Sequence, residues 1–445
     1  MAERHRLTST TSARQAFEHV KALAALGPRI AGTARERKAA AYVAQQFKSY
    51  GLPVELQAVP GIMAWEGGEA RLRVLGPGDA EELTSCPVLG SKPTPKEGIE
   101  ADLVYGGRGT SADHERLDLG GKIILHDPPR ARTLDNRCGV GEPQRALGTA
   151  VERGAVGVIE YARLPGNILQ VPCLAGPEGT PLPAVGTTYE GGLRLKELLG
   201  QWYAVPAGIA AEAPLPVRVW MKVDAESNPA TGTNVIATLA GSDLAQEKVI
   251  LLAHHDNAFG PGACDNAASV GIVLETARAL AEQASPRRTV QFISVTGEEY
   301  GSVGSGYFVQ SLGAAVSDVK ACIVLDIVGS GNKYFYITTS IFAGRMAETA
   351  AWLNERLVDT ADQLGYMLEP TILEFASDDG PFIAAGVPTS YLCRCISTSW
   401  PYLHTYMDTP DIIDYNAMKV LTDLCVFALS ELAALDDLPR GMDAR

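Results

Sequence analysis

Two adjacent histidines follow an apolar run in a chain that has only seven histidines among its 445 residues. The stretch KVILLAHHDN reads as a strand. Because side chains alternate along a strand, His254 and Asp256 share one face and His255 points to the other. Asp265 follows in a loop rich in glycine and proline, at the start of a predicted helix. Asp265 alone would be read as a helix N-cap, but together these side chains indicate a polar site at the end of the strand.

Acidic and imidazole groups recur further along the chain. Glu298 and Glu299 follow the strand-like run TVQFISV, Asp326 ends the run ACIVLD, and His404 lies in a loop before the last predicted helix. A carboxylate at the end of a buried apolar run is costly unless something compensates its charge. Carboxylates and neutral imidazoles are the usual Zn²⁺ ligands outside thiolate sites. We therefore predict a site for a pair of divalent ions, which suits hydrolysis, with a neighbouring carboxylate as the base that takes the proton of water.

These residues need a scaffold that brings the ends of several strands together. Residues 12–51 predict two helices, and from residue 234 onward apolar strands alternate with helices. The later helices are predicted at 267–283, 302–312, 342–364 and 412–435. This alternation is typical of an α/β fold with a mostly parallel central sheet and helices on both faces. In such sheets, ligands bind at the carboxyl ends of the strands.

The middle of the chain has a different texture, with many glycines and prolines and short β-like runs. A chain of this length favours two domains. We predict a discontinuous main domain formed by residues 1–62 and 222–445, with a β-rich domain inserted at residues 63–221.

The overall charge narrows the choice of partners. The net charge of −14 argues against a nucleic acid or an anionic membrane as partner. No apolar stretch approaches the roughly 18 residues of a membrane span. The first residues lack the apolar core of a signal peptide, so we expect a cytoplasmic protein, or an extracellular one if the chain is a processed form. The composition allows a homo-oligomer without specifying one.

Five motifs together resemble the M28 family of co-catalytic zinc aminopeptidases. They are AHHD…GACDNAAS, TGEEYGSVGS, VLDIVG, SDDGPF and HTYMDTPD, which occur in the family's order between residues 253 and 411. The resemblance implies a zinc-exopeptidase fold of the phosphorylase/hydrolase type. It also implies two Zn²⁺ per chain, although Co²⁺ or Mn²⁺ can occupy similar sites. The activity it implies is hydrolysis of small peptides or amides, most simply by an aminopeptidase.

The resemblance also assigns roles to individual residues. One zinc would be held by His254, Asp265 and Asp326. The other would be held by Asp265, Glu299 and His404, so that Asp265 bridges the two ions.

The remaining roles concern catalysis and support. Glu298 would be the general base that activates water, and Asp256 would orient His254 through a hydrogen bond. Asp408 would play a similar supporting part near His404. His255, on the opposite face of the strand, is expected to serve packing or to lie at the surface.

Within the inserted domain, AVERGAVGVIEYA and PLPAVGTTYEGGLRL resemble the protease-associated domain that many of these enzymes carry. Such a domain would be expected to overhang the cleft. The main motifs depart from the family at two positions. Asp379 stands where the family often has histidine, and Asn257 stands where serine is common. Neither change removes a proposed ligand or the base.

Other activities share this pattern. Arg394, on a late strand, could bind a substrate carboxylate in a dipeptidase or carboxypeptidase, or pair with a nearby acid, which we favour. A glutaminyl-cyclase-like acyltransferase would use one zinc, and retention of both ligand sets speaks against it. A non-catalytic, receptor-like relative would have lost ligands, whereas every proposed ligand is present here.

Overall fold

The computed structural model describes residues 9–76, 80–128, 142–170, 179–201, 216–373, 376–396, 400–439 and 441–442. The chain divides into two compact units, of which the first combines Met1–Ile62 with Ala230–Arg445 and the second comprises Met63–Pro229. The second unit thus ends at Pro229, whereas the sequence predicted that the inserted domain ends at Met221.

The sheet of the first unit is mostly parallel, as predicted. Its strands lie in the order β13 (Arg345–Glu348), β12 (Tyr334–Phe342), β15 (Thr389–Cys393), β11 (Val319–Leu325), β9 (Leu244–His254), β10 (Arg288–Val295) and β8 (Arg218–Leu239), with β14 (Leu368–Ile372) beside β12. The pairs β9–β10, β9–β11, β11–β15 and β12–β14 are parallel, and the pairs β8–β10, β12–β13 and β12–β15 are antiparallel.

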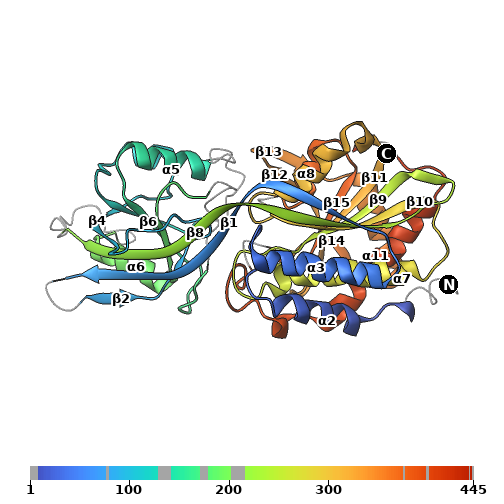
Figure 1. Ribbon diagram of the computed structural model, residues 1–445, viewed down its shortest axis with the longest axis horizontal. Helices are drawn as coiled ribbons and strands as arrows, with labels where there is room; N and C mark the ends of the chain where they lie inside the picture. The colour runs from blue at the N-terminus through green and yellow to red at the C-terminus, as the bar shows by residue number, and fades with distance from the viewer. Residues whose placement is uncertain are drawn as a thin grey trace. The chain divides into compact units, whose positions relative to one another are not determined.

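Helices cover both faces of this sheet, which confirms the predicted fold class. On one face, helices contribute to a core with Val249, Leu251 and Ala253 of β9. These helices are α2 (Ala13–Ala24), α3 (Ala34–Ser49), α7 (Ala268–Ala281), α9 (Ala351–Leu364) and α11 (Tyr415–Ala434), and Figure 1 shows α2, α3 and α7 together on this side. On the other face, α8 (Val303–Leu312) and α10 (Asp379–Ala384) pack against Ile250 and Leu252. Because residues 249–253 of β9 are buried on both faces, they form an unbroken apolar run.

Local signals account for the positions of several helix starts. The side chain of Ser12 caps α2, that of Thr33 caps α3 and that of Asp414 caps α11, each accepting a hydrogen bond from a main-chain N–H of the first turn. These residue types are the preferred N-caps because their oxygens satisfy N–H groups that have no partner within the helix. None of the helices in the described ranges is both long and apolar enough to cross a membrane.

The predicted helix at 342–364 was wrong in its first part. β13 pairs antiparallel with β12 there, with Phe342 opposite Arg345, and the helix α9 begins only at Ala351. In the turn between the two strands, Ala343 and Gly344 have φ values of 48° and 77°, in the left-handed region that favours glycine. β13 was missed because its 4 residues are too few to show a clear alternation.

Two long strands were also missed. β1 (Val54–Leu75) and β8 pair with each other, and each has residues in both units. Read from the sequence, both strands divide into short runs, because Pro60, Gly61 and Pro229 act as typical breaks in a strand. The tertiary pairing therefore overrides the local signal at these positions.

The second unit contains its own parallel strands. β4 (Ile99–Tyr105), β5 (Ile123–His126), β6 (Gly157–Tyr161) and β7 (Ala184–Thr187) pair in this order, and β3 (Ser85–Pro87) joins β7 in the antiparallel sense. The helices of this unit are α4 (Ser111–Glu115), α5 (Glu142–Glu152) and α6 (Tyr189–Leu198), and β2 (Glu81–Leu83) pairs with β1. This unit thus contains a parallel sheet with helices in addition to the antiparallel strands β1, β2 and β8.

Candidate metal centre

The ends of three adjacent parallel strands bring the predicted site residues together. β9 ends at His254, whose partner in β10 is Val295. Glu298 and Glu299 lie in the turn after β10, and Asp326 directly follows β11, on the other side of β9. Because parallel strands end at the same edge of the sheet, side chains from distant parts of the sequence meet there.

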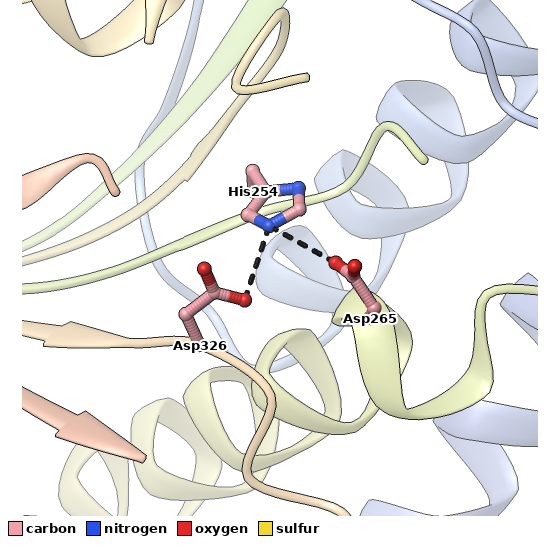
Figure 2. Close-up of side chains that lie close together, drawn as sticks. All are labelled: His254, Asp265 and Asp326. Atoms are coloured by element: carbon pink, nitrogen blue, oxygen red, sulfur yellow. Dashed lines mark hydrogen bonds and ion pairs between the residues drawn. The ribbon is translucent and has the colours of Figure 1, made fainter. Parts of the chain in front are cut away.

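The first group of potential ligands consists of His254, Asp265 and Asp326, all buried. The Nε2 atom of His254 lies 3.3 Å from Oδ1 of Asp326 and 3.5 Å from Oδ1 of Asp265. Figure 2 shows the imidazole directed between the two carboxylates. The three side chains come from the end of β9, the short helical segment η1 (Ala263–Ala267) before α7, and the residue that follows β11.

The second group consists of Asp265, Glu299 and His404. The Nε2 atom of His404 lies 3.0 Å from Oε2 of Glu299 and 3.4 Å from Oδ2 of Asp265. Asp265 therefore presents Oδ1 to the first group and Oδ2 to the second. A carboxylate used in this way can bridge two cations.

The spacing of the potential ligand atoms fits a metal ion. Two ligands of a tetrahedral zinc, each bound at about 2.0–2.2 Å, lie about 3.3–3.6 Å from each other. The contacts of His254 with Asp265 and Asp326, at 3.5 and 3.3 Å, fall in this range. In the second group, the contact of His404 with Asp265 at 3.4 Å does so too, and that with Glu299 at 3.0 Å is slightly shorter. The residues present thus fit a pair of divalent cations in both chemistry and spacing.

The electrostatics of the cluster also call for a cation. Burial raises the pKa of Glu298 well above its ordinary value, and the charges of Asp326 and Glu299 raise it further against the opposing charge of His254. Burial alone would lower the pKa of His254, but Asp326 and Glu298 raise it well above its usual range. Crowded carboxylates of this kind repel each other, and a bound cation relieves the repulsion.

A sequence comparison now places the cluster in a family. The sequence model of peptidase family M28 matches residues 234–429, which contain every candidate ligand and the candidate base. This segment belongs to peptidase family M28. The chain is therefore a metallopeptidase and a hydrolase.

Two curated proteins and one solved structure are similar to most of the chain, beyond the M28 segment. Aminopeptidase YwaD of Bacillus subtilis (strain 168) is 26% identical over 439 residues, which cover 96% of this chain and 86% of the relative. Carboxypeptidase Q of Xenopus laevis is 24% identical over 408 residues, which cover 87% and 79%. The crystal structure of BSAP, a zinc aminopeptidase from Bacillus subtilis, matches with a TM-score of 0.74 and 25% identity over 96% of this chain and 97% of that chain.

Within the M28 segment, Asp256 lies against His254, as expected, and also contacts the turn after β10. The hydrogen-bonding partner of His254 Nδ1 is the main-chain carbonyl of Asp256, at 3.1 Å, whereas the Asp256 carboxylate is 3.6 Å away. That carboxylate accepts hydrogen bonds from the main-chain N–H groups of Glu298 and Glu299, at 3.3 and 3.4 Å. Asp256 thus connects the end of β9 to the turn that carries the candidate base.

Asp408 was expected to play a supporting part near His404, and its carboxylate is hydrogen-bonded to the main chain before α7. Its carboxylate accepts from the main-chain N–H groups of Cys264 and Asp265, at 2.7 and 3.0 Å. Asp408 therefore holds the backbone of the residue shared by both groups. The spacing of the HTYMDTPD motif gave no signal for this, because the partner lies 143 residues away in sequence.

His255 lies on the opposite face, as predicted, and is fully buried. Its Nε2 atom lies 3.1 Å from Oε1 of Glu36 and its Nδ1 atom 2.9 Å from Oγ of Ser294. Glu36 belongs to α3, so His255 joins the M28 segment to the N-terminal helices. Sequence reasoning missed Glu36, which stands in an ordinary charged helix pattern.

Two other residues of the M28 segment have structural partners. Arg394 is buried, forms an ion pair with Asp414 at 3.0 Å and donates to the carbonyl of Gly331 at 2.6 Å, which confirms the pairing interpretation. Asp379, at the position where the family often has histidine, accepts a hydrogen bond from the main-chain N–H of Ser377 at 2.7 Å. It therefore stabilises the start of α10.

The metal-free protein is expected to become more stable as the pH falls from about 8 to about 5.5. Burial raises the pKa of Asp265 to about 6 and those of Asp378 and Asp408 to about 7. An unfolded aspartate has a pKa of ~3.9. At pH values between this pKa and the raised pKa values of the folded protein, the folded chain therefore binds more protons than the unfolded chain. Stability therefore falls as the pH rises through this window. His19, whose pKa burial lowers to about 4, acts in the opposite sense but is a single group.

Thermal unfolding of the metal-free protein across this range tests the prediction, with an expected rise of a few degrees in the midpoint towards lower pH. Protein loaded with Zn²⁺ provides the comparison. Its midpoint should fall over the same range because protons compete with the metal for the ligands. A metal-free midpoint that falls in parallel with that of the loaded protein would contradict the expected crowding of carboxylates.

Proposed function

We propose that the chain is a two-metal aminopeptidase that removes N-terminal residues from small peptides. The observation that carries the proposal is the bridging arrangement of Asp265, whose two oxygens face two separate groups of ligands. The zinc named for the BSAP structure supports Zn²⁺ as the metal, while Co²⁺ and Mn²⁺ suit similar ligands.

In this proposal, His254, Asp265 and Asp326 hold one ion, and Asp265, Glu299 and His404 hold the other. When bound, such a pair of ions lowers the pKa of water and polarises the scissile carbonyl. Asp408 fixes the main chain at Asp265. The N–H of Ala258 donates to Oε1 of Glu299 at 2.9 Å, which leaves Oε2 directed towards His404.

Glu298 is the proposed general base. It belongs to neither ligand group, yet its Oε2 atom lies 3.9 Å from Nε2 of His254. Its side chain is 17% exposed, so water can reach it. A carboxylate beside the ions can accept the proton of the attacking water and pass it to the leaving amine. The bonds from Asp256 to the turn keep Glu298 in place.

Recognition of a free amino group is the part of the proposal that sets the direction of cleavage. The name of the aminopeptidase relative agrees with this direction of cleavage. Arg394, the candidate for binding a substrate carboxylate, pairs with Asp414 through Nη2, while its Nε and Nη1 atoms have no hydrogen-bond partner among the described residues.

The second candidate is a carboxypeptidase or dipeptidase acting at the same centre, which the likeness to carboxypeptidase Q favours. Both candidates share the ligands and the base and differ only in which end of the substrate is bound. Rates of hydrolysis of suitable substrates therefore decide between the two candidates.

A substrate panel tests the assignment. We expect aminoacyl anilides and peptides with free N-termini to be hydrolysed, and N-acetylated forms of the same peptides to be cleaved at least ~10-fold more slowly, because a missing charge-assisted contact costs about 1.5–3 kcal/mol. Dipeptides and their C-terminal amides serve as the matched pair for the carboxylate. Equal rates on free and acetylated substrates would remove the aminopeptidase assignment, and dependence on a free carboxylate would establish the second candidate.

A further inference from the structure

Arg29 is a buried cation outside the ligand groups. It lies between α2 and α3, its side chain is fully buried, and it makes none of the ion pairs found among the described residues. A buried charge without a contacting partner is costly unless hydrogen bonds compensate it. The guanidinium must therefore have a specific set of acceptors.

Those acceptors are main-chain carbonyls, and most belong to the loop between His254 and Asp265. Nε of Arg29 donates to the carbonyl of His255 at 2.8 Å, Nη1 to that of Pro261 at 2.7 Å and Nη2 to that of Gly262 at 3.0 Å. His255 directly follows the first potential ligand, and Gly262 closely precedes Asp265. One planar side chain thus joins both ends of the loop.

Asn257 completes this arrangement from within the loop. Its Oδ1 atom accepts from the main-chain N–H of Arg29 at 2.7 Å, and its Nδ2 atom donates to the carbonyls of Phe259 and Gly260 at 2.9 and 3.2 Å. Packing is so close that a Cβ atom at Gly262 would lie 2.5 Å from Nδ2 of Asn257. The loop therefore has little freedom once Arg29 is in place.

The position of Arg29 also places a fixed positive charge near the site. The charges of Asp408, Asp256, Asp265 and Glu299 all act on its guanidinium. Asp408 holds the main chain at Asp265, and Arg29 holds the loop that precedes it.

We propose that Arg29 is a positioning residue that sets the separation of His254 and Asp265 and thereby tunes the affinity of the metal centre. The inference rests on the proposed two-metal function. Lysine cannot replace Arg29 here, because a single ammonium has three donors and no planar fork, whereas Arg29 serves carbonyls at several separate points.

The test compares Arg29→Met and Arg29→Lys with the matched control Arg37→Met. Arg37 comes from the same segment, is exposed, and donates to the carbonyl of Gly32 without touching the loop. Each metal-free protein is titrated with Co²⁺, whose visible spectrum reports the geometry of its ligands, and with Zn²⁺ in competition with a chromophoric chelator. Thermal midpoints are recorded with and without metal.

We expect Arg29→Met to weaken metal binding 10–100-fold, the usual effect of losing a group that orients ligands, and to alter the Co²⁺ spectrum. Arg29→Lys should weaken it at least several-fold, and Arg37→Met should match the wild type. A lowered thermal midpoint with wild-type affinity and spectrum in Arg29→Met would overturn the proposal. If Arg29→Met does not fold, wild-type affinity in Arg29→Lys would overturn it. Wild-type protein that binds neither metal would instead refute the proposed function itself.

Discussion

Glu298→Gln is expected to lower kcat/KM for aminoacyl substrates about 10²–10⁴-fold, the usual contribution of a general base. The substitution keeps the shape of the side chain and removes its ability to accept a proton. Because Glu298 belongs to neither ligand group, the metal content of the purified protein should equal that of the wild type. Steady-state kinetics together with elemental analysis of the metal measure both effects.

Glu299→Gln is the matched control for this experiment, since it makes the same chemical change one residue further on. Glu299 belongs to the second ligand group, so this variant should lose metal as well as activity. Full turnover by Glu298→Gln would end the assignment of the base. Loss of metal from Glu298→Gln would move Glu298 from the role of base to that of ligand.

Asp265→Asn is expected to weaken binding at both ions and to reduce activity by more than about 100-fold, since losing even an outer-shell partner costs 10–100-fold. Asp265 is the residue that the two ligand groups share. The variant should still fold, because removing one of several crowded buried carboxylates relieves repulsion in the metal-free protein. Isothermal titration with Zn²⁺ measures the number of ions bound and their affinities.

Asp326→Asn separates a shared ligand from an unshared one. Asp326 belongs to the first group alone, so this variant should retain one ion of nearly wild-type affinity. If Asp265→Asn and Asp326→Asn lose metal to the same extent, Asp265 does not bridge.

The sequence predicted the members of the site better than their supporting contacts. His254, Glu299 and Asp326 were identifiable because each follows an apolar run at a place where a charge needs compensation. The contacts of Asp256 and Asp408 with main-chain N–H groups could not be foreseen, since a main-chain donor carries no sequence signal. Arg29 was missed for the same reason, because all of its acceptors are carbonyls.

The fold, too, could be predicted only in part from the sequence. The parallel strands around β9 were predicted because their central residues are buried on both faces and therefore mostly apolar. β1 and β8 were divided too early, since the glycine and proline residues within them indicate turns when read locally. The resemblance of residues 63–221 to a protease-associated domain stays a prediction.

The two oxygens of Asp265 have a thermodynamic consequence. A side chain that faces two groups of potential ligands cannot be oriented for one without being oriented for the other. Occupancy of either site would therefore change the affinity of its neighbour, and by linkage the change would be equal in both directions. Pre-orientation of the shared carboxylate would favour joint filling, whereas repulsion between the cations would favour stepwise filling. The curvature of a metal titration would report which of the two free energies is larger.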